Sequence, residues 1–71
     1  MKKEVDFGDR LRELRQETNM TQTRLAEILC MSQDNISLWE TNKSFPDYMT
    51  LRQLTEIFGV SADFLLCLSD Y

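Results

Sequence analysis

Residues 21–43 read TQTRLAEILCMSQDNISLWETNK, and this stretch decides the fold. Two segments in it carry apolar residues at helical spacing, and each begins at a residue that favours a helix N-terminus, Thr21 and Ser32. Only Cys30 and Met31 stand between the two predicted helices. Because a link this short forces a sharp crossing, the sequence predicts two short helices that meet at a tight turn.

The second of these helices, over residues 32–40, has two unlike faces. Ile36 and Trp39 share one side at 100° per residue, so both are expected in the core. The opposite side carries an amide, an acid, a hydroxyl and one leucine: Gln33, Asp34, Ser37 and Leu38. Such residues are ordinary on a solvated surface, so the pattern alone leaves the role of this face open.

Apolar residues elsewhere define the rest of the expected core. The helix before the turn, over residues 21–29, has an apolar side made of Leu25, Ala26, Ile28 and Leu29. The phenylalanines are also expected in or near the core: Phe7, Phe45, Phe58 and Phe64.

The flanking chain predicts three further short helices. The first covers about residues 7–18 and follows Asp6, a candidate N-cap. Asp47 and Ser61 are candidate N-caps of a fourth and a fifth helix, and Gly59 ends the fourth. No segment shows the alternation that is typical of a strand. The sequence therefore predicts an all-α fold with five short helices.

Length and composition limit the class of protein. The 71 residues are expected to form one domain, over residues 1–71, and 42% apolar with 28% charged residues is typical of a folded globular protein. No apolar run approaches the roughly 18 residues that span a bilayer. The opening MKKEVDFGDR lacks the apolar segment of a signal peptide. A cytoplasmic protein without a membrane partner is expected.

Side chains that usually carry metal or acid–base chemistry are scarce. The chain has no histidine and two cysteines, Cys30 and Cys67, so it lacks the commonest general base and the usual four ligands of a structural zinc site. Two cysteines are also too few for a disulfide framework, and free thiols are expected. We therefore expect no enzyme activity, no cofactor, no metal site and no small-molecule ligand.

The charge of the chain bears on a nucleic-acid partner. A net charge of −4 argues mildly against one, because such proteins are usually basic. Arginines nevertheless gather at positions 10, 12, 15 and 24, and Lys43 follows the 32–40 helix. A local basic rim is therefore compatible with the sequence. Arg10 is a candidate phosphate contact, and the alternative is a solvated helix face on which arginines pair with glutamates.

Four segments, taken in order, resemble one known family. They are RLRELRQETNMTQTRLAEIL, SQDNISLWETNK, FPDYMTLRQLTEIFGVSADFLL and LSD, and they cover nearly the whole chain. Together they resemble a Cro/repressor-type helix-turn-helix domain of the lambda-repressor-like, or XRE, family. The resemblance implies a compact five-helix DNA-binding fold with its helix-turn-helix over about residues 21–40. It also implies that the 32–40 helix lies in the major groove of double-stranded DNA.

The resemblance assigns roles to individual residues. It implies base reading by Gln33, Asp34, Ser37 and Leu38. It implies contacts with the DNA backbone by Gln22, Asn35, Thr41, Asn42 and Lys43. It also implies a structural ion pair between Arg15 and Glu40. In the major groove, Asp34 could accept a hydrogen bond from cytosine N4 or adenine N6, Gln33 could contact adenine at two points, and Leu38 could pack on a thymine methyl.

Three positions depart from the pattern of the family. Cys30, in the turn, and Cys67 stand where the family often has glycine, and Asn42 replaces another frequent glycine. A cysteine in the left-handed backbone region costs on the order of 1 kcal/mol. The turn at Cys30 is therefore expected to be adjusted or mildly strained, whereas an asparagine tolerates positive φ.

The ending DFLLCLSDY contains consecutive apolar residues over positions 64–68, more than one helix face can bury against its own domain. We expect Leu66, Leu68 and Tyr71 to contribute to self-association, because family members usually bind DNA as two-fold dimers. The alternative is that this tail packs back on the first helix.

These observations predict a sequence-specific transcriptional regulator that binds double-stranded DNA. The expected form is a small bacterial or phage-type repressor that binds a pseudo-palindromic operator as a homodimer. The alternative is a protein-interaction module on the same fold, such as an antitoxin or a partner-binding regulator. The acidic balance of the chain and its apolar tail favour that alternative.

Overall fold

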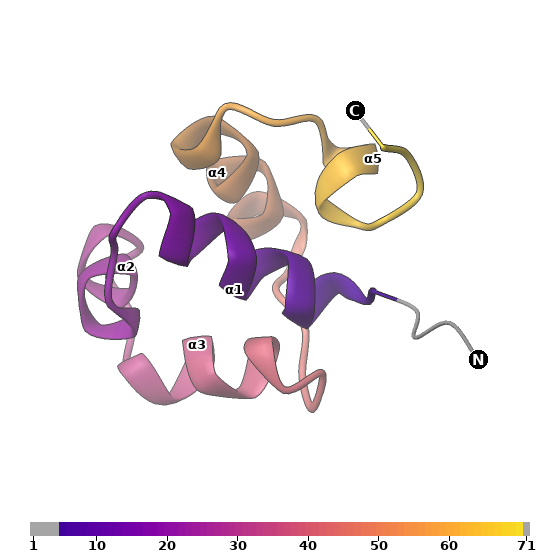
Figure 1. Cartoon of the computed structure of the whole chain (residues 1–71). Helices are drawn as coiled ribbons and strands as arrows, with labels where there is room; N and C mark the ends of the chain where they lie inside the picture. The colour runs from indigo at the N-terminus through magenta and orange to yellow at the C-terminus, as the bar shows by residue number, and fades with distance from the viewer. Residues whose placement is uncertain (1–4, 71) are drawn as a thin grey trace.

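Five helices make up most of residues 5–70, the part of the chain that the computed structural model describes (Figure 1). In chain order they are α1 (Phe7–Glu17), α2 (Gln22–Ile28), α3 (Gln33–Glu40), α4 (Tyr48–Phe58) and α5 (Ala62–Leu65). No strand occurs between residues 5 and 70, so the predicted all-α class is confirmed. α1 runs between α3 and α5, which lie on opposite sides of it (Figure 1).

Side chains placed just before the helices set where most of them begin. Asp6, Thr21, Asp47 and Ser61 each accept a hydrogen bond from a backbone N–H of the first turn that follows. The bonds that Asp47 accepts from Thr50 stabilise its ionised form and lower the pKa of its carboxyl. These starts agree with the sequence prediction. Ser32 precedes α3 as predicted, but its side chain makes no capping hydrogen bond.

A residue with positive φ follows each helix within two positions of its last residue. The five are Asn19, Cys30, Asn42, Gly59 and Cys67, with φ between 57° and 64°. The residue after each of them donates its N–H to a carbonyl five positions back, at 2.8 to 3.1 Å. This is the left-handed C-terminal motif that satisfies the last carbonyls of a helix. Glycine occupies one of the five positions, so the strain expected at Cys30 is present and also occurs at Cys67.

The core takes one fully buried residue from every helix. Leu11, Leu25, Ile36, Leu54 and Leu65 have no exposed surface and come from α1 to α5 in turn. Trp39 is 5% exposed and packs in the same cluster. The predicted burial of Ile36 and Trp39 is therefore confirmed.

Two apolar residues that were predicted in the core are exposed. Ile28 is 39% exposed, because Leu25 and Leu29 already occupy the inner side of α2 and Ile28 faces away from it. Phe45 is 62% exposed in the loop between α3 and α4, where its ring contacts Phe7 with a centroid separation of 6.1 Å. A loop position buries only one side of such a ring.

The predicted fifth helix, which follows Ser61, is short. α5 covers four residues, because Cys67 turns into the left-handed region and the N–H of Leu68 bonds to the carbonyl of Asp63. The remaining apolar residues therefore leave the helix rather than extend it.

Gly8 allows the start of α1 to lie directly on the end of α3. A Cβ atom at this position would stand 2.5 Å from the carbonyl oxygen of Trp39 and 2.7 Å from that of Glu40. The N–H of Gly8 donates to Oδ1 of Asn42 at 2.9 Å, which satisfies one of the free donors of the first turn. The two helices therefore meet through backbone atoms.

Candidate nucleic-acid interface

The outer face of α3 carries the four residues to which the family resemblance assigned base reading. Gln33 and Asp34 are exposed, Leu38 is 40% exposed, and Ser37 is half-buried. On the inner side, Ile36 and Trp39 anchor the helix in the core. α3 therefore presents a mixed polar and apolar surface on a helix whose position is fixed by its other side.

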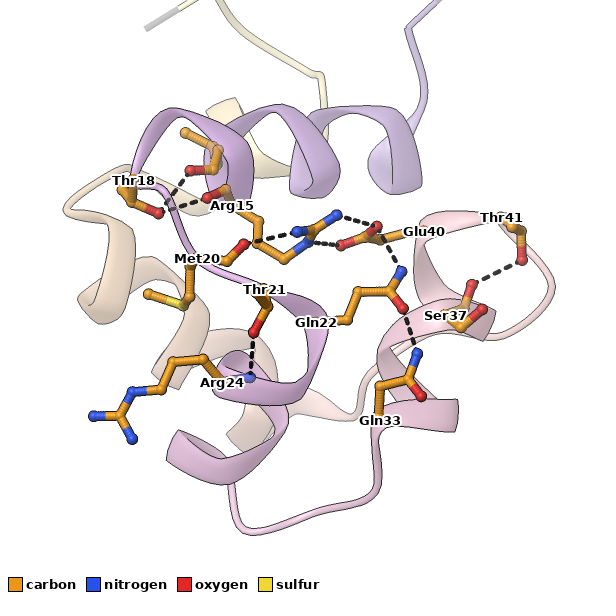
Figure 2. A network of polar contacts seen from close by, with 11 residues as sticks. Arg15, Thr18, Met20, Thr21, Gln22, Arg24, Gln33, Ser37, Glu40 and Thr41 are labelled. Carbon is orange, nitrogen blue, oxygen red and sulfur yellow. Dashed lines mark hydrogen bonds and ion pairs between the residues drawn. The ribbon is translucent and has the colours of Figure 1, made fainter.

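A buried ion pair ties α1 to the end of α3 (Figure 2). Nε of Arg15 lies 2.6 Å from Oε2 of Glu40, and Nη2 of Arg15 lies 3.1 Å from Oε1. The side chain of Glu40 is 2% exposed and that of Arg15 is 12% exposed. Nη1 of Arg15 also donates to the carbonyl of Met20 at 2.7 Å. The structure thus contains the ion pair that the resemblance implied, in two-point geometry.

Two glutamines continue this network to the start of α3. Nε2 of Gln22, at the start of α2, donates to Oε1 of Glu40 at 3.0 Å. Nε2 of Gln33 in turn donates to Oε1 of Gln22 at 2.5 Å. Figure 2 shows the chain of bonds from Arg15 through Glu40 and Gln22 to Gln33. The resemblance implied the pair of Arg15 and Glu40, but the sequence gave no sign that Gln22 and Gln33 extend it.

The residues assigned to the DNA backbone surround the ends of α3. Asn35, Thr41 and Lys43 are exposed, and Asn42 is half-buried. The hydroxyl of Thr41 donates to the carbonyl of Ser37 at 2.9 Å. Oδ1 of Asn42 already accepts the N–H of Gly8, so its amide nitrogen is the group left for an external contact.

Arg10 lies away from this surface. Its guanidinium stacks over the ring of Phe64 at 4.0 Å from the centroid, and Nη1 donates to the carbonyl of the same residue at 3.1 Å. Nε lies 3.8 Å from a carboxylate oxygen of Glu13, and the side chain is 15% exposed. Because α5 and α3 lie on opposite sides of α1, the structure uses Arg10 to hold α5 and gives no support to a phosphate contact.

The residues assigned to self-association are only partly described. Leu66 is 38% exposed and Leu68 is 74% exposed, whereas Tyr71 lies outside the described residues. Leu65 is fully buried and Phe64 is half-buried under Arg10. The first part of the tail therefore packs back on its own domain, as the alternative prediction held, and the second part leaves two leucines facing solvent.

Charge near α3 is balanced. Among the exposed residues of α2, α3 and the turn that follows, Arg24 and Lys43 are cationic, and Glu27 and Asp34 are anionic. Arg24 already lies 3.3 Å from Glu27. Within residues 5–70, no group of histidine, cysteine or acidic side chains could hold a metal ion. None of the helices in that range is both long enough and apolar enough to cross a bilayer.

The chain is similar to known helix-turn-helix proteins. A family model described as a helix-turn-helix domain matches residues 8–70. The HTH-type transcriptional activator BcrR of Enterococcus faecalis is 39% identical over 62 residues, which are 87% of this chain and 30% of that protein. The HTH-type transcriptional regulator YonR, derived from the SPbeta prophage of Bacillus subtilis, is 40% identical over 60 residues, which are 84% of this chain and 56% of that protein.

The solved structures include repressor domains of the same shape. The P22 c2 repressor in complex with a synthetic operator superposes with a TM-score of 0.83 and 28% identity, over 89% of this chain and 96% of that one. The solution structure of the DNA-binding domain of the P22 c2 repressor gives a TM-score of 0.77. The chain spans 30% to 56% of the length of the two curated relatives named above.

Proposed function

Because the chain belongs to the helix-turn-helix family of Cro/repressor type, we propose that it is a transcriptional regulator that binds specific sequences in double-stranded DNA. The single observation that carries the proposal is that the two sides of α3 differ. Its inner side chains, Ile36 and Trp39, are buried, while Gln33, Asp34 and Leu38 face solvent. The similar P22 c2 repressor is bound to an operator in its structure.

In this proposal α3 enters the major groove, which is wide enough for a helix. The carboxylate of Asp34 accepts a hydrogen bond from cytosine N4 or adenine N6, and Leu38 packs on a thymine methyl. An acid near phosphates weakens attraction, so Asp34 contributes selectivity rather than affinity. Ser37 lies between these residues on the same face.

The proposed contacts with the DNA backbone lie at both ends of α3. The second N–H of the Gln22 amide, the side chain of Asn35 and the ammonium of Lys43 are donors for phosphate oxygens. The amide nitrogen of Asn42 remains for the same purpose. Thr41 takes part by turning its hydroxyl away from the carbonyl of Ser37.

Few positive charges support these contacts. With Arg24 and Lys43 as the exposed cations around α3, a dimer neutralises about four phosphates, and the log–log salt slope is expected near −4. A slope near −10 would contradict this picture of the interface. Regulation by simple occupancy of a promoter requires no catalytic step.

A homodimer that binds a pseudo-palindromic operator is part of the proposal. Half-sites about one helical turn apart, roughly 34 Å, require two copies of α3 on one face of the duplex. Leu66 and Leu68 are the exposed apolar residues that support self-association. Sedimentation velocity should show a dimer that Leu68→Glu dissociates. A monomer at high concentration, unchanged by that substitution, would remove this part of the proposal.

Selection from a pool of random duplexes tests the function directly. The folded protein should enrich a motif with two related half-sites, and Asp34→Asn should change the preferred base at one position of each half-site. Asn35→Ala serves as a control, because loss of a backbone contact should lower affinity for all sequences alike. No enrichment by the folded protein would overturn the proposal.

A second candidate function is a protein-interaction module. The exposed Leu66 and Leu68 and the net charge of −4 favour it. Under this alternative the random pool yields no motif, and Leu68→Glu abolishes binding of a protein partner.

A further inference from the structure

The hydrogen bonds that link Arg15, Gln22 and Gln33 to Glu40 all have their donors directed towards the Glu40 carboxylate. Arg15 donates to Glu40, Gln22 donates to Glu40, and Gln33 donates to Gln22. Each amide on the way therefore presents its nitrogen towards the carboxylate and its oxygen away from it. The two glutamine amides therefore point the same way along the network.

The carboxylate of Glu40 forces this direction. An ionised carboxylate accepts hydrogen bonds and donates none, whereas a glutamine amide can do either. Oε1 of Glu40 accepts from both Arg15 and Gln22, and the two-point pair with Arg15 keeps the buried group from turning. Gln22 must then present its NH₂ group to Glu40, so its oxygen is the atom left for Gln33.

The same constraint reaches the proposed DNA surface. Gln33 must give one N–H to Gln22, which leaves it Oε1 and a second N–H for a base. In the major groove adenine offers an N6 donor beside the N7 acceptor, whereas guanine offers two acceptors, O6 and N7. An amide that shows both an oxygen and an N–H is complementary to adenine.

We propose that Glu40 is a positioning residue that determines which base Gln33 reads. Glu40 is buried at the far end of α3 and acts through Gln22 by fixing the direction of two amide groups in series. The inference rests on the proposed function, since it requires that α3 read bases. Glu40 would then determine specificity without contacting DNA.

A neutral amide at position 40 removes the constraint. In Glu40→Gln the new carbonyl oxygen can still accept from Arg15, while the new NH₂ group can donate to Oε1 of Gln22. Gln22 then turns its own NH₂ group towards Oε1 of Gln33. Gln33 is left with two N–H donors, which suit the two acceptors of guanine.

The test compares half-sites that differ at one base pair. The pair read by Gln33 is first located as the position at which Gln33→Ala loses discrimination. The wild-type protein should prefer adenine over guanine there by roughly tenfold or more, as a two-point contact gives. In Glu40→Gln this preference should fall to near parity or reverse, while preferences at the other positions persist.

Two further variants separate positioning from stability. Arg15→Gln breaks the ion pair but keeps the carboxylate, so the adenine preference should persist although the protein is less stable. Gln22→Leu keeps the ion pair and removes the link, so the preference should fall. Gln22→Leu decides the matter if Glu40→Gln does not fold.

The results that overturn the inference are distinct from those that overturn the function. Sequence-specific binding in which folded Glu40→Gln or Gln22→Leu keeps the wild-type adenine preference refutes the inference alone. A wild-type preference for guanine at the pair read by Gln33 does the same. Binding by the wild-type protein without any sequence preference refutes the proposed function, and the inference with it.

Discussion

Two arginines of α1 reach opposite neighbours, and they hold them differently. Arg15 forms a buried two-point ion pair with Glu40 of α3, whereas Arg10 stacks on Phe64 of α5 and donates to its carbonyl. The first arrangement fixes both distance and direction, because planar groups meet edge to edge. Stacking on a ring tolerates sliding. The α3 side is thus held in one orientation, while the α5 side is held in place with less directional control.

The largest loss of stability is expected from removing Glu40, the acid that holds the α3 side. Glu40→Ala leaves the Arg15 guanidinium without its charged partner in a site where the Arg15 side chain is only 12% exposed. Breaking a buried pair in this way costs about 3–5 kcal/mol, which is a large part of the stability of a small domain. Urea unfolding followed by circular dichroism measures the loss. A loss below about 1 kcal/mol would show that the pair does not hold α3.

The backbone contact between α1 and α3 is tested by Gly8→Ala. The added methyl would lie 2.5 Å from the Trp39 carbonyl oxygen, so the helices must separate. Overpacking of this kind costs about 1–3 kcal/mol. Gly59→Ala is the matched control, since nothing lies within 4 Å of its Cβ and only the positive φ opposes it, at about 1 kcal/mol. Equal losses for the two variants would mean that the helices do not meet closely at Gly8.

A smaller loss of stability is expected from removing Arg10, which holds the α5 side. Arg10→Ala removes one stacking contact and one hydrogen bond, together about 1–2 kcal/mol. The free energy of unfolding should therefore fall by less than in Glu40→Ala. Arg24→Ala is the control, because its ion pair with Glu27 is exposed and is expected to be worth less than about 1 kcal/mol. A loss for Arg10→Ala as large as for Glu40→Ala would erase the difference between the two sides.

The smallest expected effect is a gain in stability, from replacing a cysteine that has positive φ. Cys30→Gly relieves the left-handed strain at φ 58° and should raise the free energy of unfolding by about 1 kcal/mol, because Cys30 is exposed and loses no packing. Cys67→Gly on the α5 side should gain less, since that side chain is half-buried. Thermal unfolding of both variants measures the gain. Cys30→Ser keeps a Cβ at the same φ and should leave stability unchanged, so a gain there would point to another cause.

The local features of the fold could be predicted from the sequence. Asp6, Thr21, Asp47 and Ser61 stand where caps are needed, and their short side chains accept bonds from N–H groups of the first turn. Ser32 stands at the same kind of position but makes no such bond. The side of α3 that carries Trp39 followed from periodicity alone. Such features depend on neighbours in the chain, so a single sequence contains the information.

Features that depend on distant segments could not be predicted in the same way. The exposure of Phe45 depends on how much of its loop covers the ring, and the position of Arg10 depends on where α5 returns to α1. Gly8 left one signal, a glycine inside an otherwise helical pattern, which often marks a close approach. The sequence contains no signal for the bond between Gln22 and Gln33, because either amide could equally have faced solvent.

The core described above takes one fully buried side chain from every helix, including the four-residue α5. No helix can therefore detach without exposing part of a cluster that all the others share. Local opening and global unfolding should merge into one cooperative event. In native-state hydrogen exchange, the most protected amides of all five helices are expected to exchange with a common free energy.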